Sequence, residues 1–195
     1  SDDGVKRLGS CGKPVAGYEA AIFDGDGREV PVGEQGEIWV RGGGTIKGYY
    51  KNPEATQTEF TADGWWKSGD MAYMDSKGYM YIVDRKKNMI ISGGFNVYSS
   101  EVESALLSHP AVLNAAVIGI PHQEWGEVVH AEVILKEGVT VSESELMEHV
   151  KQLRGAIKSP KSIAFVKELP MSPAGKVLHR FIRDKYWKGQ KRSVS

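Results

Sequence analysis

The residues best suited to chemistry lie where a charged run meets a pair of glycines. The charged run Asp84–Lys87 is followed by the apolar run Met89–Ile91 and then by Ser92–Phe95, which contains both glycines. Glycine adopts backbone angles that other residues avoid, so a ligand can lie directly against the main chain at such a place. The competing interpretation is a surface hairpin whose charges are only solvated, and this stretch alone does not decide between the two.

Two further candidates stand apart from this stretch. Asp70 follows a Ser-Gly pair, and Lys176 follows Gly175 in the proline-containing segment 169–180. The prolines and the glycine predict an irregular exposed loop, with Lys176 at its tip just ahead of an amphipathic terminal helix. Taken singly, Asp70 is expected to begin a turn and Lys176 to be a solvated surface charge.

Composition limits the classes of partner. The chain has 195 residues, with 25 Lys and Arg against 25 Asp and Glu, so its formal net charge is zero. No overall field draws it to nucleic acid or to an anionic membrane, and any anion site must be local. Cys11 is the only cysteine, which excludes an internal disulfide and fits a reducing compartment. With no apolar run long enough to span a bilayer and no secretory signal, we expect a cytoplasmic protein.

Two glycine-containing segments imitate ligand-binding motifs but lack essential residues. Asp24–Gly27 begins like a calcium loop, yet Arg28 stands where a third acidic ligand is needed and Gln35 replaces the closing glutamate. Gly42–Thr45 is followed neither by Gly-Lys-Ser/Thr nor by a helical pattern, so it does not fit a nucleotide-binding loop. We therefore predict a tight turn, a bend and no metal site.

The first part of the chain is expected to be a small antiparallel β unit. Apolar runs bounded by turn residues predict strands at 18–23, 36–41, 71–74 and 79–83. Before the third strand, Asn52 followed by Pro53 predicts the start of a short helix that ends near Phe60. The last two strands would form a hairpin that leads into Asp84–Lys87.

After Asp84 the composition and periodicity change to those of an α+β domain. Capping boxes at Ser100–Glu103 and Ser142–Glu145 predict two helices with apolar residues at helical spacing. Apolar runs predict strands at 112–120, 128–135 and 162–166. Helices packed on one sheet would result. We therefore predict the α+β fold class in two domains, residues 1–84 and residues 85–195.

Several motifs, taken together and in order, resemble the adenylate-forming enzymes, the family of the acyl-CoA synthetases, firefly luciferase and the adenylation domains of peptide synthetases. They cover nearly the whole chain: Ser68-Gly69-Asp70, Gly78-Tyr79, Asp84-Arg85-Lys86-Lys87, Gly93-Gly94-Phe95-Asn96-Val97, Glu101-Val102-Glu103, Pro170, Gly175-Lys176 and Arg180. Within the family, Val83–Lys87 and Gly94–Tyr98 look most like bacterial fatty acyl-CoA ligases. The chain departs from the pattern at Ser99 or Ser100, where many relatives carry proline, and at His179, where arginine is common.

The resemblance implies a role for each candidate. Asp70 would hold the ribose hydroxyls of ATP, and Arg85 would contact the ribose or the phosphates. Lys176 would be the catalytic residue, reaching the carboxylate and the α-phosphate during adenylation. Lys87 resembles the hinge about which the C-terminal domain swings. The loop that would guide the thiol of CoA contains Ser92, Gly93, Gly94 and Phe95.

The resemblance also implies that much of the enzyme lies elsewhere. The family's phosphate loop, acyl pocket and Tyr-Gly-x-Thr-Glu stretch are not in this sequence, so we expect a fragment: the last part of the large domain plus the C-terminal lid, inactive alone. The parent would be an ATP-dependent acid:CoA ligase that uses ATP, CoA and a fatty or other carboxylic acid, with Mg²⁺ held by ligands outside this chain. The alternatives are an adenylation domain that loads a carrier protein and a non-catalytic lid acting in trans on a separate large domain.

Overall fold

The computed structural model describes residues 7–189, which fall into two units, Ser1–Lys86 and Lys87–Ser195. The sequence-based division after Asp84 lies two residues earlier. The difference arises because the last strand of the first unit continues to Arg85, whose Cα is paired with that of Asp70 on the neighbouring strand.

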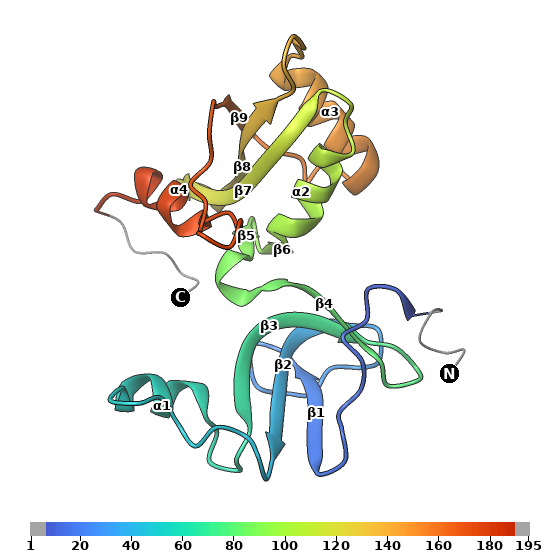
Figure 1. The fold of residues 1–195 in the computed structure, drawn as a ribbon, viewed down its shortest axis with the longest axis vertical. Coiled ribbons are helices and arrows are strands. Elements are labelled where there is room, and N and C mark those ends of the chain that lie inside the picture. Colours follow the sequence, from blue (N-terminus) through green and yellow to red (C-terminus); the bar gives the residue numbers. More distant parts are fainter. Residues whose placement is uncertain (1–6, 190–195) are drawn as a thin grey trace. The chain divides into compact units, whose positions relative to one another are not determined.

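The first unit is built on an antiparallel sheet in the order β1-β2-β3-β4 (Figure 1). Its strands are β1 (Tyr18–Phe23), β2 (Gln35–Gly42), β3 (Trp66–Met74) and β4 (Met80–Arg85). The predicted strands are all present, but β3 begins five residues before the predicted start at Met71. Alternation fails there because Gly69 has φ +72° and the register between β2 and β3 shifts between Glu37 and Trp39.

Both faces of this sheet carry apolar side chains. One cluster contains Ala21, Phe23, Trp39 and Trp65, with the rings of Phe23 and Trp39 stacked at 4.2 Å. The other contains Ile22, Ile38, Ala72 and Met80. Neighbouring residues of β1 enter opposite clusters because successive strand side chains point to opposite faces. Strands β1 and β2 are therefore packed on both faces, whereas β3 and β4 contribute Ala72 and Met80 to the second cluster.

Two local predictions for the first unit are confirmed. Helix α1 (Pro53–Glu59) begins at Asn52, whose side chain accepts a hydrogen bond from the Ala55 amide at 3.1 Å. The turn after β1 is closed by Asp24 Oδ1, which accepts from the amides of Asp26 and Arg28, both at 2.9 Å. The Asp24 carboxylate is thus used within the turn.

The second unit is an α+β domain, as predicted. Its sheet has the order β6-β5-β8-β7, with β9 parallel to β8. The strands are β5 (Ile90–Ser92), β6 (Phe95–Val97), β7 (Val112–His122), β8 (Gly126–Leu135) and β9 (Ser162–Phe165). The helices are α2 (Ser99–Leu107), α3 (Glu143–Arg154) and α4 (His179–Tyr186).

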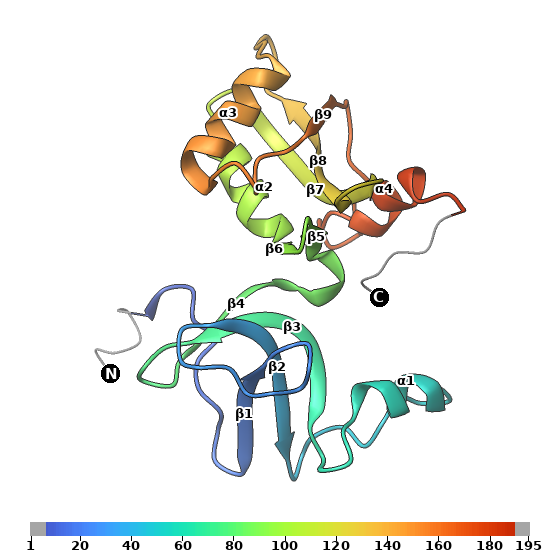
Figure 2. The same cartoon turned by 180° about the vertical axis from the view of Figure 1, so that it is seen from behind.

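Helices cover both faces of this second sheet. Along β7, Ala115 and Val117 belong to the large cluster shared with α2 and α3, whereas Ala116 and Ile118 pack with the fully buried Ile182 of α4. Figures 1 and 2 show α4 on the side of the sheet opposite α2 and α3. The continuous apolar run of β7 is explained by this burial on both faces.

One capping box is confirmed and the other is wrong. Ser142 Oγ accepts from the Glu145 amide at 3.2 Å and starts α3. Helix α2 instead starts at Ser99, with Tyr98 as N-cap and no side-chain capping bond. Its glutamates have other partners: Glu101 pairs with Lys158, and Glu103 accepts from the Val117 amide at 2.8 Å. The predicted box is absent because Ser100 lies inside α2, and its capping carboxylate, that of Glu103, is used by the Val117 amide.

Candidate functional site

Asp70 and Arg85 face each other across β3 and β4. Their Cα atoms are partners in the ladder, and Arg85 Nε lies 2.7 Å from Asp70 Oδ1. The side chain of Asp70 is 22% exposed and that of Arg85 is 59% exposed, so the pair lies at the surface of the first unit. The expectation that Asp70 alone would begin a turn is wrong, because it lies inside β3.

The proposed hinge residue lies in a single 3₁₀ turn, Lys86–Asn88. Lys87 is exposed, and its carbonyl oxygen accepts a hydrogen bond from Arg183 Nη1 of α4 at 2.6 Å. The start of the second unit is thereby attached to its last helix. Nothing in the sequence near Lys87 indicates this contact, because Arg183 is 96 residues away.

The segment from Ser92 to Phe95, in which the resemblance implies a CoA-guiding loop, is a tight hairpin between β5 and β6. Ser92 and Phe95 are paired between β5 and β6, and the two intervening residues, Gly93 and Gly94, have φ +57° and +84°. A two-residue turn of this kind requires positive φ at both central positions, which explains the two glycines. A Cβ added at Gly94 would meet nothing within 4 Å, so the space beside this turn is open.

A cavity of about 350 Å³ adjoins this hairpin. One wall is formed by three of the four predicted loop residues, Ser92, Gly93 and Phe95. The other wall comes from distant parts of the second unit: Trp125, Ala156, Ile157 and Lys161. Phe95 and Trp125 are large apolar residues that remain 58% and 44% exposed. Lys161 Nζ lies 5.6 Å from the centre of the Trp125 ring. The sequence-based prediction missed Trp125 and Lys161. The only signal in the sequence was an aromatic residue, Trp125, in a segment expected to be a turn.

Lys176 lies in a turn that is better ordered than the predicted irregular loop. Met171 and Val177 form an antiparallel bridge, and the Ser172 amide donates to the Lys176 carbonyl at 2.8 Å. Ser172 Oγ also accepts from the Lys176 amide at 3.1 Å. The side chain is exposed, and in the part of the chain that the structure describes its ammonium makes neither a hydrogen bond nor an ion pair. Lys176 is not among the residues that line the cavity.

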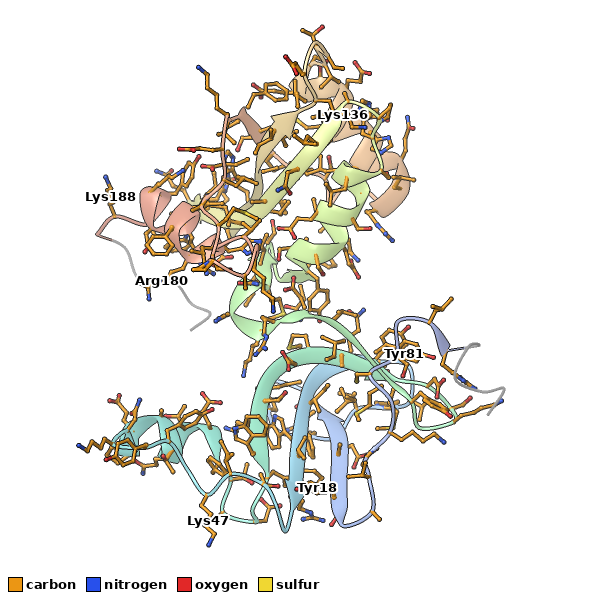
Figure 3. The ribbon with its side chains drawn as sticks, in the orientation of Figure 1. Tyr18, Lys47, Tyr81, Lys136, Arg180 and Lys188 are labelled. Carbon is orange, nitrogen blue, oxygen red and sulfur yellow. The ribbon has the colours of Figure 1, made fainter. Side chains whose placement is uncertain are left out.

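Helix α4 anchors this turn to the rest of the second unit. His179, the first residue of α4, has Nε2 at 2.6 Å from Glu103 Oε1 of α2. At the far end of α4, Tyr186 OH lies 2.9 Å from His130 Nε2, and His130 Nδ1 lies 2.7 Å from Ser162 Oγ. Burial lowers the pKa of His130, while the neighbouring Glu132 acts in the opposite direction. Arg180, labelled in Figure 3, is exposed on α4.

Residues 7–189 lack two other features. They contain no group of three or more His, Cys, Asp or Glu that could hold a metal ion. They also contain no helix of the length and apolar character needed to cross a membrane.

Comparison with known proteins identifies the family. Residues 1–50 match the AMP-binding enzyme family, and residues 101–176 match the AMP-binding enzyme C-terminal domain. A sulfoacetate–CoA ligase of Cupriavidus necator is 42% identical over 176 residues, which are 90% of this chain and 34% of that protein. A medium/long-chain-fatty-acid–CoA ligase of Mycobacterium tuberculosis is 40% identical over 200 residues, 99% of this chain and 35% of that protein.

A solved structure supports the same assignment. ATP-bound MatB from Rhodopseudomonas palustris superposes with a TM-score of 0.84 at 38% identity, covering 91% of this chain and 36% of that chain. The chain thus spans about a third of the length of the relatives it matches. It belongs to the adenylate-forming enzymes and corresponds to their C-terminal portion.

Proposed function

We propose that this chain is the C-terminal part of an ATP-dependent acid:CoA ligase. In the first half-reaction the acid carboxylate attacks the α-phosphorus of ATP, which gives an acyl-adenylate and releases pyrophosphate. In the second, the thiol of CoA attacks the acyl carbon, which gives the thioester and releases AMP. The observation that carries the proposal is the ordered match of both parts of the family, together with alignment over about nine-tenths of the chain to CoA ligases.

Asp70 and Arg85 are proposed to bind the nucleotide. A carboxylate can accept hydrogen bonds from both hydroxyls of a ribose, and the Asp70 side chain is partly exposed. The Arg85 guanidinium has further N–H groups beyond the Nε–H that faces Asp70, and these suit ribose or phosphate oxygens. The ion pair would orient both side chains before ATP arrives.

Lys176 is proposed to act in the adenylation step. Negative charge gathers on the α-phosphoryl oxygens as the carboxylate attacks, and a positioned cation stabilises that charge. Among the described residues the exposed ammonium has no partner, so it can be brought to a phosphate without first breaking an ion pair with any of them. The turn that carries it is fixed by main-chain hydrogen bonds, so little conformational freedom is lost on use.

The hairpin Ser92–Phe95 and its cavity are proposed to serve the second half-reaction. The open space beside Gly94 allows an extended thiol-bearing chain to pass close to the backbone. The faces of Phe95 and Trp125 suit an aromatic base, and Lys161 suits a phosphate, both of which CoA carries. Lys87 would be the hinge that brings first the Lys176 turn and then this hairpin to the adenylate.

The acid-selecting residues and the metal ligands are assigned to parts of the parent enzyme outside this chain. Fatty acids are the substrate class that the Val83–Lys87 and Gly94–Tyr98 motifs favour, and this would place the protein in fatty acid metabolism in the cytoplasm. The residues that select the acid are proposed to lie in the large domain that precedes this chain in the parent. Mg²⁺ would accompany ATP, and its ligands are proposed to lie in the part of the parent outside this chain.

The test is acid-dependent exchange of pyrophosphate into ATP, followed by thioester formation with CoA. The chain alone should give neither signal, and the parent ligase, in which a complete AMP-binding domain precedes it, should give both. Exchange catalysed by the chain alone would exclude the proposal that it is a part of the enzyme. Acyl transfer from the parent to a phosphopantetheinylated carrier protein but not to CoA would instead support the carrier-loading alternative.

A further inference from the structure

A buried carboxylate on β2 has no role in the function proposed so far. Glu37 is only 4% exposed, although carboxylates are rarely buried without partners. Both of its oxygens are occupied. Oε1 accepts from the Gly69 amide at 3.0 Å, and Oε2 accepts from Lys86 Nζ at 3.0 Å and from Trp39 Nε1 at 3.2 Å. Such a set of charge-assisted contacts fixes the carboxylate in one orientation.

One of these contacts fixes the main chain directly before Asp70. The ladder between β2 and β3 shifts register between Glu37 and Trp39, and Gly69 adopts φ +72° within β3. A bulge of this kind turns an amide out of the ladder and re-aims the residue that follows it. The Gly69 amide is turned to Glu37 Oε1, so the carboxylate holds the bulge from which Asp70 projects.

Another contact fixes the residue directly after Arg85. Lys86 ends the first unit, and its ammonium is 3.0 Å from Glu37 Oε2. Its side chain is partly exposed, at 42%, whereas that of Glu37 is 5% exposed, so the lysine reaches inward to the carboxylate. The end of β4 is therefore attached to β2 at the last position before Lys87.

We propose that Glu37 is a positioning residue for nucleotide binding, acting through Asp70 and Arg85. Glu37 holds Gly69, directly before Asp70, and Lys86, directly after Arg85. The side chains of Asp70 and Arg85 meet at 2.7 Å. The same contact with Lys86 keeps β4 in place while the backbone changes its angles at Lys87. This inference rests on the proposed nucleotide role of Asp70 and Arg85.

A role of Glu37 through its charge and a role through its position predict different effects on ATP binding in Glu37→Gln and Lys86→Gln. ATP is a polyanion, so if Glu37 acted only through its charge, Glu37→Gln would strengthen ATP binding and Lys86→Gln would weaken it. If Glu37 acts by position, both variants loosen the same contacts and both weaken binding. Glutamine has nearly the shape of glutamate, so Glu37→Gln leaves the buried volume filled. Glu19→Gln is the matched control, because Glu19 forms a 2.7 Å ion pair with Arg41 on the same sheet but is 63% exposed.

The experiment measures the KM for ATP in adenylation by the parent ligase, and the ¹⁵N–¹H signals of Gly69 N–H and Arg85 Nε–H in this chain. We expect Glu37→Gln and Lys86→Gln each to raise KM about fivefold to tenfold, with a smaller change in kcat, and to shift both signals. The double variant should be little worse than either single one, because the two act through one contact. Glu19→Gln should change neither measurement.

Three results would overturn the inference. The first is KM values that move in opposite directions, which would indicate a charge effect. The second is an unchanged KM in Glu37→Gln, and the third is a lowered melting temperature with both NMR signals unmoved, which would indicate a purely structural side chain. An inactive wild-type parent would instead contradict the proposed function, and the NMR signals would still report whether Glu37 holds the pair.

Discussion

Two exposed turns of the second unit, one at Lys176 and one at Gly93–Gly94, are alike in construction and opposite in what they present. Each closes a short antiparallel bridge or ladder, and each contains glycine at positive φ. The Lys176 turn presents an ammonium that has no partner among residues 87–189. The hairpin presents backbone, open space and an apolar cavity. A cation suits a step in which phosphate charge develops, whereas a neutral open backbone suits the passage of a thiol-bearing chain.

The two turns are also anchored differently. The Lys176 turn depends on α4, whose His179 pairs with Glu103 and whose Ile182 is fully buried. The hairpin depends on β8, through the pairing of Ser92 with Gly126 and the bond from the Gly93 amide to the Trp125 carbonyl at 3.0 Å. Because the two turns are held by different contacts, a change in one turn should leave the other in place. We therefore expect the two half-reactions to be separable by mutation.

The largest effect is expected at Lys176. In the parent ligase, Lys176→Ala should lower the rate of acid-dependent adenylation about a hundredfold to a thousandfold, because it removes a cation from the developing charge. Unfolding free energy should change by less than about 0.5 kcal/mol, since the side chain is exposed. Lys136→Ala removes a different exposed lysine of the same unit, labelled in Figure 3, and should leave the rate unchanged. An equal loss in Lys136→Ala would mean that general surface charge, not Lys176, is what matters.

A smaller effect is expected at the hairpin. Gly94→Asn should slow thioester formation about tenfold while leaving adenylation intact. Asparagine tolerates positive φ, and a Cβ at this position meets no protein atom within 4 Å, so the loss would report a clash with the approaching acceptor. Rates from supplied acyl-adenylate and CoA provide the measurement. Gly138→Asn is the matched control, since Gly138 also has positive φ and open space. Normal thioester formation in Gly94→Asn would remove the hairpin from the proposed acceptor path.

A change at the hinge should affect the two turns unequally. Proline at Lys87 fixes φ near about −65° and removes an amide donor, so it should trap one orientation of the C-terminal unit. Lys87→Pro should impair thioester formation at least about fivefold more than adenylation. Lys87→Ala, which keeps the backbone free, should behave like the wild type in both. Equal losses in Lys87→Pro with folding intact would show that Lys87 is ordinary surface.

The smallest effect concerns stability and pH. Burial lowers the pKa of His130 in the native state, so between that pKa and the unfolded value of about 6.5 the unfolded chain binds more protons. The contribution of His130 to stability is therefore full above about pH 6.5 and is lost as the pH falls through that value toward the lower native pKa. As the pH falls below about 6.5, the urea midpoint of the second unit should decline less steeply in His130→Gln than in the wild type. In His122→Gln, which alters an exposed histidine, the slope should stay that of the wild type.

Local patterns sufficed for much of the fold. The strand Tyr18–Phe23 was predicted with the observed bounds, and the capping box at Ser142 marked the start of α3. The start of β3 was not predictable, because the bulge at Gly69 breaks alternation and is held by Glu37, 32 residues away. Helix α2 began away from its apparent box because Glu101 and Glu103 found partners in other elements.

The candidate site divides in the same way. The glycine pair and Lys176 are marked by local turn chemistry, so their exposure could be predicted. The contact between Asp70 and Arg85 depends on the register of β3 and β4. The cavity depends on Trp125 and Lys161, which are brought to the hairpin by the pairing of β8 with its neighbouring strands. Pairings of this range are specified by the fold as a whole and not by any short segment.

The measurement that most directly tests the separation of the two turns is a side-by-side comparison of Lys176→Ala and Gly94→Asn in both half-reactions of the parent ligase. Single-turnover adenylation and thioester formation from supplied acyl-adenylate would be followed for each protein. We expect each variant to be slow in a different half-reaction: Lys176→Ala only in adenylation, and Gly94→Asn only in thioester formation. If both variants lost both half-reactions in the same proportion, the assignment of one turn to each step would be contradicted.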